Sequence, residues 1–161
     1  MYWRAGEVMK IRLDRLQEYP RGSPERVCAS LGLGLITVES LTQATSSNPS
    51  EGHNDKNSNH LGRIRFLFDN PSDDAIKLCN GTPVKQPDLD EPHFFDGRHR
   101  YLAALLRGDS TINVLFRWGN HDCLPYFLSR PVIAYLTGDS DVKPKGTIYE
   151  WQDNEAFVDY Y

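Results

Sequence analysis

The sequence has few cysteines and no long run of hydrophobic residues. Its three cysteines stand far apart, at Cys28, Cys79 and Cys123. An odd number at this spacing fits neither a disulfide framework nor a four-ligand zinc site, so we expect reduced, mostly buried thiols. No stretch approaches the roughly 18 apolar residues of a membrane span, and the first residues lack the apolar run of a signal peptide. The sequence therefore predicts a cytoplasmic protein without a membrane span.

Positive charge is not in excess either. Lys and Arg number 18 against 22 Asp and Glu, which gives a formal net charge of −4. This balance argues against a protein held on nucleic acid by positive charge over its whole surface, and it is compatible with a local basic site. Hydrophobic residues make up 39% of the 161 residues, enough for a packed core, and this length corresponds to about one domain. We predict a single domain over residues 1–161.

Residue periodicity predicts a mixture of short strands and helices. Alternating or β-branched apolar residues predict strands over 8–13, 35–41, 64–68, 75–79, 93–95, 111–118 and 147–151. Helical spacing and capping residues predict helices over 24–32 and 98–107, and a helix with an extended piece, broken at Pro131, within 124–136. Asn80-Gly81 suits a hairpin turn. The expected fold class is α/β (α+β), a small mixed sheet with packed helices.

A long polar segment at about 42–62 predicts a flexible surface loop. It contains almost no apolar residues, and loops beyond about 12–15 residues are uncommon in compact domains. His53, Asp55 and His60 lie within it, but their spacing matches no familiar set of metal ligands. We interpret them as solvated loop residues, with a metal site as the alternative.

The most informative segment is a predicted strand, a glycine and a helix. Arg98, His99 and Arg100 occupy the first turn of the helix after Gly97. The free N–H groups of a helix N-terminus favour an anion, and arginine adds charge-assisted donors. Basic residues there oppose the helix dipole, so a purely structural helix would more often carry acids. The pattern predicts a phosphate site, with a solvated face as the alternative, and Gly97 allows close approach of a ligand.

This segment resembles a known family. The run Asp-Gly-Arg-His-Arg-Tyr-Leu-Ala-Ala at 96–104, after an aromatic strand and before a further strand, is similar to the core of the ParB/sulfiredoxin superfamily, where Gly-x-His/Arg-Arg opens a helix. The N-terminal run at 11–16, followed by Tyr19-Pro20-Arg21, is similar to the first strand and Pro-Arg turn of ParB-like domains. The two stretches cover about a third of the chain.

The resemblance implies a site in which Gly97, His99 and Arg100 surround the phosphates of a nucleotide or of DNA, joined by Arg21. Arg98 stands where sulfiredoxins have their catalytic cysteine and partition proteins a glutamate, which makes a sulfiredoxin-type reductase the less favoured activity. Members with an Asp-Gly-x-His-Arg motif occur among ParB-like nucleases and in plasmid fertility-inhibition factors of the Osa type. The implied function is that of an ATPase or DNase of plasmid or phage type, a group that includes inhibitors of conjugative DNA transfer.

Hydrolysis would need a group that orients water or a metal ion. Asp96 is the candidate ligand for Mg²⁺ or Mn²⁺, with Asp88, Asp90 or Glu91 as helpers, and its alternative role is a helix N-cap. His99 can act as a general acid or base, and Arg100 can stabilise the charge that develops on a phosphoryl group of ATP or another nucleotide.

Other residues carry weaker predictions. We interpret His121 and Asp122 as surface residues, although their loop could lie beside the phosphate site. Phe94, Phe95 and Trp118 could stack on a base, but a place in the core is the favoured interpretation. The rival function is a non-catalytic module that binds nucleic acid or a protein partner and blocks another machine.

Overall fold

The structure is a computed structural model that describes residues 8–48, 59–79, 92–116 and 130–143. Several predictions lie outside the described residues. They concern the turn at 80–81, the strand at 147–151, and the residues His53, Asp55, Asp88, Asp90, Glu91, Trp118, His121, Asp122 and Cys123.

Four strands of the described residues form one mixed sheet. They are β1 (Val8–Arg12), β2 (Ile76–Cys79), β3 (His93–Asp96) and β4 (Thr111–Phe116). The order is β1-β4-β2-β3, in which β4 is antiparallel to β1 and parallel to β2, and β3 is antiparallel to β2. The predicted small mixed sheet with packed helices is confirmed.

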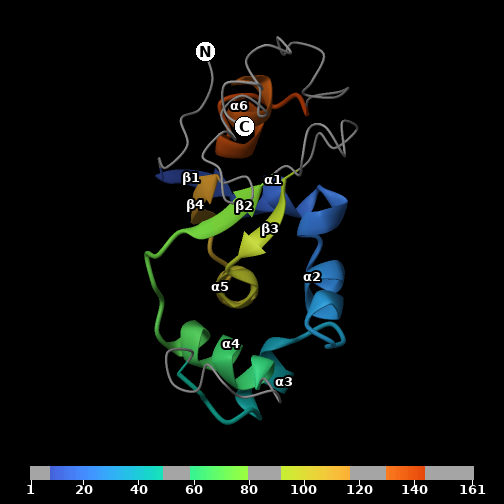
Figure 1. The fold of residues 1–161 in the computed structure, drawn as a ribbon, viewed down its shortest axis with the longest axis vertical. Helices are drawn as coiled ribbons and strands as arrows, with labels where there is room; N and C mark the ends of the chain where they lie inside the picture. The colour runs from blue at the N-terminus through green and yellow to red at the C-terminus, as the bar shows by residue number, and fades with distance from the viewer. Residues whose placement is uncertain (1–7, 49–58, 80–91, 117–129, 144–161) are drawn as a thin grey trace, which may run out of the picture.

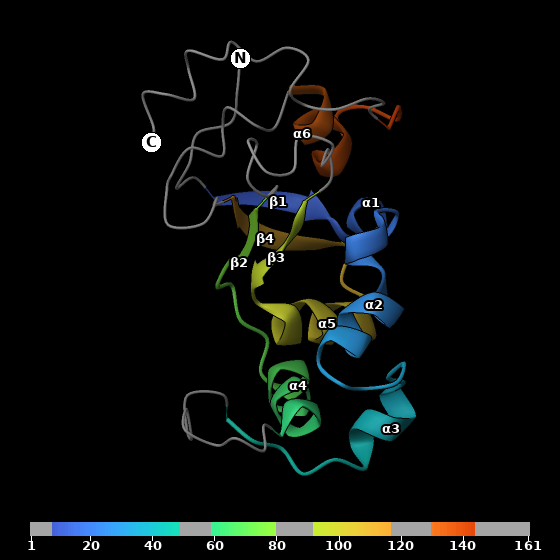
Figure 2. The same cartoon turned by 45° about the vertical axis from the view of Figure 1, so that its right-hand side comes forward.

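The helices form layers on both sides of this sheet (Figures 1 and 2). They are α1 (Leu13–Gln17), the 3₁₀ turn η1 (Pro20–Gly22), α2 (Pro24–Ser30), α3 (Val38–Thr42), α4 (His60–Asp69), α5 (Arg98–Arg107) and α6 (Arg130–Thr137). Helix α6 covers one face of the sheet and α5 the other, while α4 and α3 lie beyond α5 (Figure 2). Helix α5 is therefore an inner layer between the sheet and α4.

The apolar residues of α5 explain this position. Tyr101 and Leu102 are buried, and Leu105 and Leu106 are partly buried against the core, as the apolar stripe predicts. Ala103 and Ala104 are also buried, so the helix is covered around most of its circumference. The helix ends as predicted at Gly108, which has a left-handed backbone conformation with φ +79°.

The predicted strand at 64–68 is wrong, because these residues lie within α4. Their short apolar run is part of a helical pattern in which Leu61, Ile64 and Phe68 recur at intervals of three and four. The Asn59 side chain caps the helix by accepting a hydrogen bond from the Gly62 N–H at 2.9 Å. This helix also shortens the predicted loop, since residues 60–62 are helical.

The predicted strand at 35–41 is also wrong. Residues 38–42 form α3, which begins with a capping box in which Thr37 and Ser40 exchange side-chain and backbone hydrogen bonds. The β-branched residues before this box suggested a strand, but local capping favours the helix.

Of the predicted segment 124–136, residues 124–129 lie outside the described residues, and residues 130–136 are helical. Pro131 lies in the first turn of α6, where its missing N–H has no helical partner in any case. The helix predicted from Pro24 is confirmed, with Ser23 accepting a hydrogen bond from the Arg26 N–H.

Candidate phosphate site at the start of α5

Gly97 joins β3 to α5 in a backbone conformation that favours glycine. Its φ is +99°, and a Cβ atom here would lie 2.6 Å from Cγ2 of Ile76. Gly97 is the N-cap of α5, and no side chain caps the first turn. The first helical hydrogen bond runs from the Tyr101 N–H to the Gly97 carbonyl oxygen at 2.9 Å, so the N–H groups before Tyr101 remain available to an anion.

Asp96 does not cap helix α5, so one of the two roles predicted for it is wrong. Its carboxylate is exposed, 3.6 Å from Nη2 of Arg100 and 3.9 Å from Nζ of Lys77. Both distances are longer than a hydrogen bond, so these ion pairs are loose. Within the described ranges no group of three or more His, Cys, Asp or Glu side chains is placed to hold a metal ion. A cation here would have one carboxylate ligand from these residues, with oxygens of phosphate or water completing the set.

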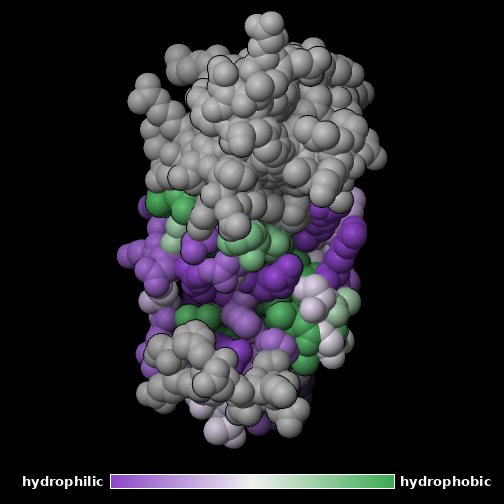
Figure 3. Space-filling view, viewed as in Figure 1, coloured by the Kyte–Doolittle hydropathy of each residue, from purple (hydrophilic) through white to green (hydrophobic). Residues whose placement is uncertain are grey.

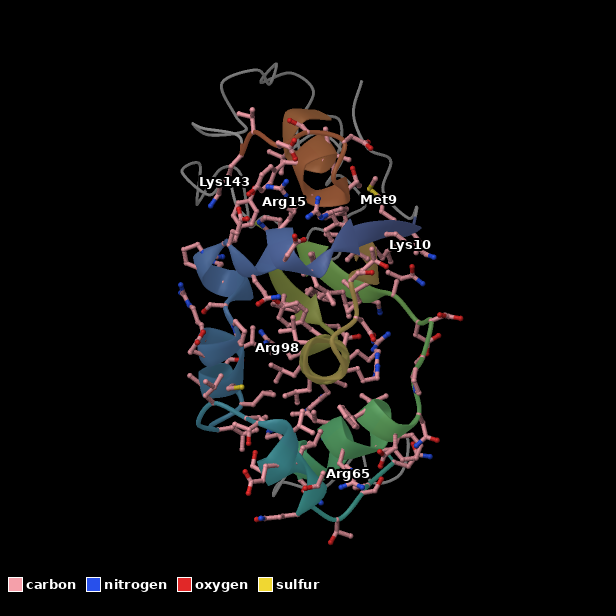
Figure 4. The ribbon with its side chains drawn as sticks, turned by 180° about the vertical axis from the view of Figure 1, so that it is seen from behind. Met9, Lys10, Arg15, Arg65, Arg98 and Lys143 are labelled. Atoms are coloured by element: carbon pink, nitrogen blue, oxygen red, sulfur yellow. The ribbon has the colours of Figure 1, made fainter. Side chains whose placement is uncertain are left out.

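Arg98 and Arg100 point to different sides of α5. Successive residues in a helix are separated by about 100° around its axis, so the two arginines lie on nearly opposite sides. Arg98 donates from Nη2 to the Phe94 carbonyl oxygen at 3.3 Å, and Figure 4 shows it on the side of α5 that faces α2. Arg100 donates from Nη1 to the Ala75 carbonyl oxygen at 2.9 Å, just before β2. The structure therefore does not bring the predicted basic residues together as one cluster of side chains.

His99 pairs with a residue of α4. Its Nε2 atom lies 2.8 Å from Nδ1 of His60, and one ring must donate the proton that the other accepts. The ring centroids are 5.1 Å apart with 24° between the planes. Because the two nitrogen atoms lie between the centroids, the rings meet edge to edge rather than face to face.

The surroundings of this histidine pair favour the neutral rings. Burial lowers the pKa of His99 to about 4, with further lowering by His60, Arg63 and Arg98 and an opposing effect of Asp96. Burial also lowers the pKa of His60, as does the charge of Arg63. The close, in-line nitrogen atoms fit a hydrogen bond and not a shared metal ion, which needs about 2.0–2.1 Å to each nitrogen with both lone pairs aimed at it.

The turn that carries Arg21 packs beside α5. The Tyr101 hydroxyl donates a hydrogen bond to the Gly22 carbonyl oxygen, and burial raises the pKa of this tyrosine. The Pro-Arg turn and the start of α5 thus belong to one region of the fold, although Arg21 and Gly97 are 76 positions apart in the sequence. Phe94 is buried with its ring centroid 4.7 Å from that of Tyr101, as the core interpretation predicts, whereas Phe95 is 44% exposed.

A pocket of about 160 Å³ lies on the Arg100 side of α5. Sequence reasoning missed it, although Arg100 and Arg107 are seven positions apart and so share one side of the helix. Its lining is strongly polar and comes from α4, α5, the connection before β2, and strands β1 and β4. The charged lining residues are Lys10, Asp73, Asp74, Arg100, Arg107 and Asp109.

No family model, curated protein or solved structure matches this chain. None of the described helices combines the length and apolar character needed to cross a membrane.

Proposed function

We propose that this chain is a ParB/sulfiredoxin-like protein that binds the phosphate groups of a nucleotide or of DNA at the start of α5. The observation that carries the proposal is the uncapped first turn after Gly97, with Arg98 beside it. Oriented backbone N–H groups and a guanidinium are a strong combination for a phosphate oxyanion.

The basic residues have different roles in this proposal. Arg98 uses one of its five N–H donors on the Phe94 carbonyl oxygen, so the other donors remain for a ligand. Arg21 belongs to the η1 turn, which is bonded to α5 through Tyr101. Arg100 and His99 are positioning residues, because Arg100 ties α5 to the chain before β2 and His99 ties it to α4. The phosphate therefore contacts backbone N–H groups, Arg98 and Arg21, and not three successive side chains.

Hydrolysis of a phosphoanhydride or phosphodiester bond is the second part of the proposal. Asp96 immediately precedes the phosphate site and its carboxylate is exposed, which suits a group that orients water or a divalent cation. Mg²⁺ or Mn²⁺, when bound, would supply polarisation of the phosphoryl oxygens. A role of the plasmid or phage type, including inhibition of conjugative DNA transfer, rests on the resemblance of residues 96–104 to ParB-like proteins.

Binding without hydrolysis is the alternative function. The two cations near Asp96, Arg100 and Lys77, already offset its charge and compete with a metal ion for the carboxylate. A phosphate-binding module of this kind would recognise nucleic acid or a protein partner and block another machine.

Binding and turnover test these functions separately. We expect Arg98→Ala to weaken binding of ATP or of a DNA fragment roughly tenfold, the scale of one charge-assisted hydrogen bond, in titration calorimetry or fluorescence anisotropy. Arg26→Ala is the matched control, since Arg26 is an exposed arginine of α2 whose guanidinium makes no hydrogen bond or ion pair among the described residues. Equal affinities of both variants and the unaltered protein would exclude the site.

Turnover is measured as phosphate release from ATP and as plasmid nicking, with and without Mg²⁺ or Mn²⁺. If hydrolysis uses Asp96, Asp96→Asn abolishes turnover and retains binding. Binding without turnover in the unaltered protein would instead establish the non-catalytic module.

A further inference from the structure

The pocket on the Arg100 side of α5 has the properties of a second, independent binding site. It lies between α5, the connection from α4 to β2, and the paired strands β1 and β4. Figure 4 shows Lys10 on the same side of the molecule as this connection, which is drawn in green, and Arg98 on the opposite side of α5. On the face drawn in Figure 3, the described surface between the two grey regions is mostly hydrophilic. The phosphate site proposed above and this pocket therefore use different sides of one helix.

Backbone groups of the connection are held in place, while its acidic side chains have no partner among the residues that the structure describes. Asn113 donates from Nδ2 to the Asp73 carbonyl oxygen at 2.9 Å, and the Asp74 N–H donates to Oγ of Ser72 at 3.1 Å. Arg100 holds the end of the segment through the Ala75 carbonyl oxygen at 2.9 Å. The carboxylates of Asp73 and Asp74 make no hydrogen bond or ion pair to any described residue. This wall of the pocket is preorganised and carries unused negative charge.

The lining of the pocket also includes positively charged side chains. Arg107 is fixed by its ion pair with Asp109 at 2.7 Å and by a hydrogen bond to the Leu67 carbonyl oxygen at 2.7 Å. Lys10 is exposed and its ammonium group has no partner within the described part of the chain. In the sheet Lys10 is paired with Asn113, the residue that holds Asp73. Lys10 and Asp73 are thus neighbours of the same asparagine, yet they form no ion pair.

The size and charge of the pocket define the class of ligand. At about 10–15 Å³ for each water molecule, the pocket volume of about 160 Å³ holds on the order of ten waters. This volume is well below the roughly 300–1,000 Å³ of pockets that bind larger ligands. A simple anion would meet the carboxylates of Asp73 and Asp74, and a simple cation would meet Lys10 and the arginines. A ligand with both signs of charge is complementary to both kinds of side chain.

We propose that this pocket binds a small zwitterion, with its oxyanion toward Lys10 and its ammonium group toward Asp73 and Asp74. The oxyanion is a carboxylate or a phosphate, and both present the same chemistry to the lysine. Phosphoethanolamine and β-alanine are suitable probes, because two methylene groups separate the ammonium group from the phosphate in the first and from the carboxylate in the second. Inorganic phosphate and ethanolamine are the half-ligands.

Titration calorimetry of the full chain with these four compounds tests the proposal. At least one zwitterion should bind at least about tenfold more tightly than either half-ligand, because each half-ligand meets side chains of like charge as well as side chains of unlike charge. Preference for phosphoethanolamine or for β-alanine identifies the oxyanion. Affinities of both zwitterions no higher than those of the half-ligands would overturn the proposal.

Charge-neutralising variants locate the binding. The double variant Asp73→Asn, Asp74→Asn should bind the preferred zwitterion about fivefold or more weakly. The same variant should bind inorganic phosphate more tightly, because a repulsive charge is removed. Lys10→Gln should lower the affinity for both the zwitterion and inorganic phosphate. Glu39→Gln removes one exposed carboxylate from α3, outside the pocket, and should change neither affinity. Parallel changes of zwitterion and phosphate in the aspartate variant would contradict the proposed orientation.

Failure of this proposal is distinguishable from failure of the phosphate site. Lys10, Asp73 and Asp74 have no part in the site at the start of α5, and Arg98 does not line the pocket. Binding of the zwitterion at the pocket should therefore be unchanged in Arg98→Ala, which weakens only phosphate binding at the start of α5. Loss of zwitterion binding in that variant, while its fold is retained, would place the ligand at the start of α5 and exclude the pocket.

Discussion

The histidine pair between α4 and α5 predicts loss of stability in mild acid. His99 and His60 are joined through ring nitrogens 2.8 Å apart, and each occupies the first turn of its helix, where the dipole disfavours positive charge. Arg63 and Arg98 add positive charge near His99, and Asp96 is the one nearby charge that opposes them. Protonation of either ring in the folded protein is therefore disfavoured.

The sign of the pH dependence follows from the lowered pKa. The pKa of His99 is about 4 in the folded protein against 6.5 for the ordinary residue. Between these values the unfolded chain binds more protons than the folded chain, so the free energy of unfolding decreases as the pH falls from about 6.5 toward about 4. Above pH 6.5 both states hold neutral histidine and the contribution does not change with pH.

The magnitude is bounded by the same values. At about 1.4 kcal/mol for each pKa unit, the difference between 6.5 and about 4 corresponds to at most about 3.5 kcal/mol. His99 is only part-buried, so solvent screening reduces the expected loss to about 1–2 kcal/mol. The lowered pKa of His60 acts in the same direction.

Denaturant unfolding between pH 7.5 and pH 4 measures this loss. Other acidic groups titrate over the same range, so the informative quantity is the difference between the unaltered protein and His99→Gln, which has no titrating ring. We expect the variant to lose about 1–2 kcal/mol less over this range, and His60→Gln to show a smaller difference. Identical pH dependence of the unaltered protein and His99→Gln would refute the reasoning.

Two further predictions concern the contacts that position α5. Gly97→Ala should lower the free energy of unfolding by about 2 kcal/mol or more, because its φ is +99° and the new Cβ would meet Ile76 at 2.6 Å; a thermal midpoint within a degree of the unaltered protein would disprove this. Tyr101→Phe removes the buried hydroxyl that bonds the Gly22 carbonyl oxygen, with an expected loss of about 1–2 kcal/mol in chemical denaturation, and an unchanged midpoint would show that water replaces the bond.

The sequence was most informative where one short segment contained all the signals. The strand before Asp96, the glycine at position 97 and the helix from Arg98 to Arg107 occur where predicted, because the aromatic run, the glycine and the apolar stripe lie within 15 consecutive residues. Residues 64–68 form a short aromatic and aliphatic run that by itself predicts a strand, although they belong to the helix at 60–69. Its cap at Asn59 and the apolar residue at Leu61 lay in a segment interpreted as loop.

The side chains of the candidate site were harder to predict than its backbone. Arg98, His99 and Arg100 are consecutive in the sequence, which suggests one cluster, but a helix directs consecutive residues to different sides. The histidine pair joins residues 39 positions apart, and the polar pocket combines β1, the connection before β2, and α5. Such contacts depend on the packing of α4 and the sheet around α5, which residue patterns within a single segment do not contain.

The central position of α5 connects these observations. Because the sheet covers one side of this helix and α4 another, its few polar residues can emerge only where neighbouring elements leave room. Arg98 emerges on the side that faces α2, and Arg100 emerges with Arg107 at the pocket. The basic residues in the first turn of α5 thus belong to two separate surfaces. One surface has uncapped N–H groups, and the other is lined by both carboxylates and cations. The two proposals follow from this difference: an anion at the first surface and a ligand with both signs of charge at the second.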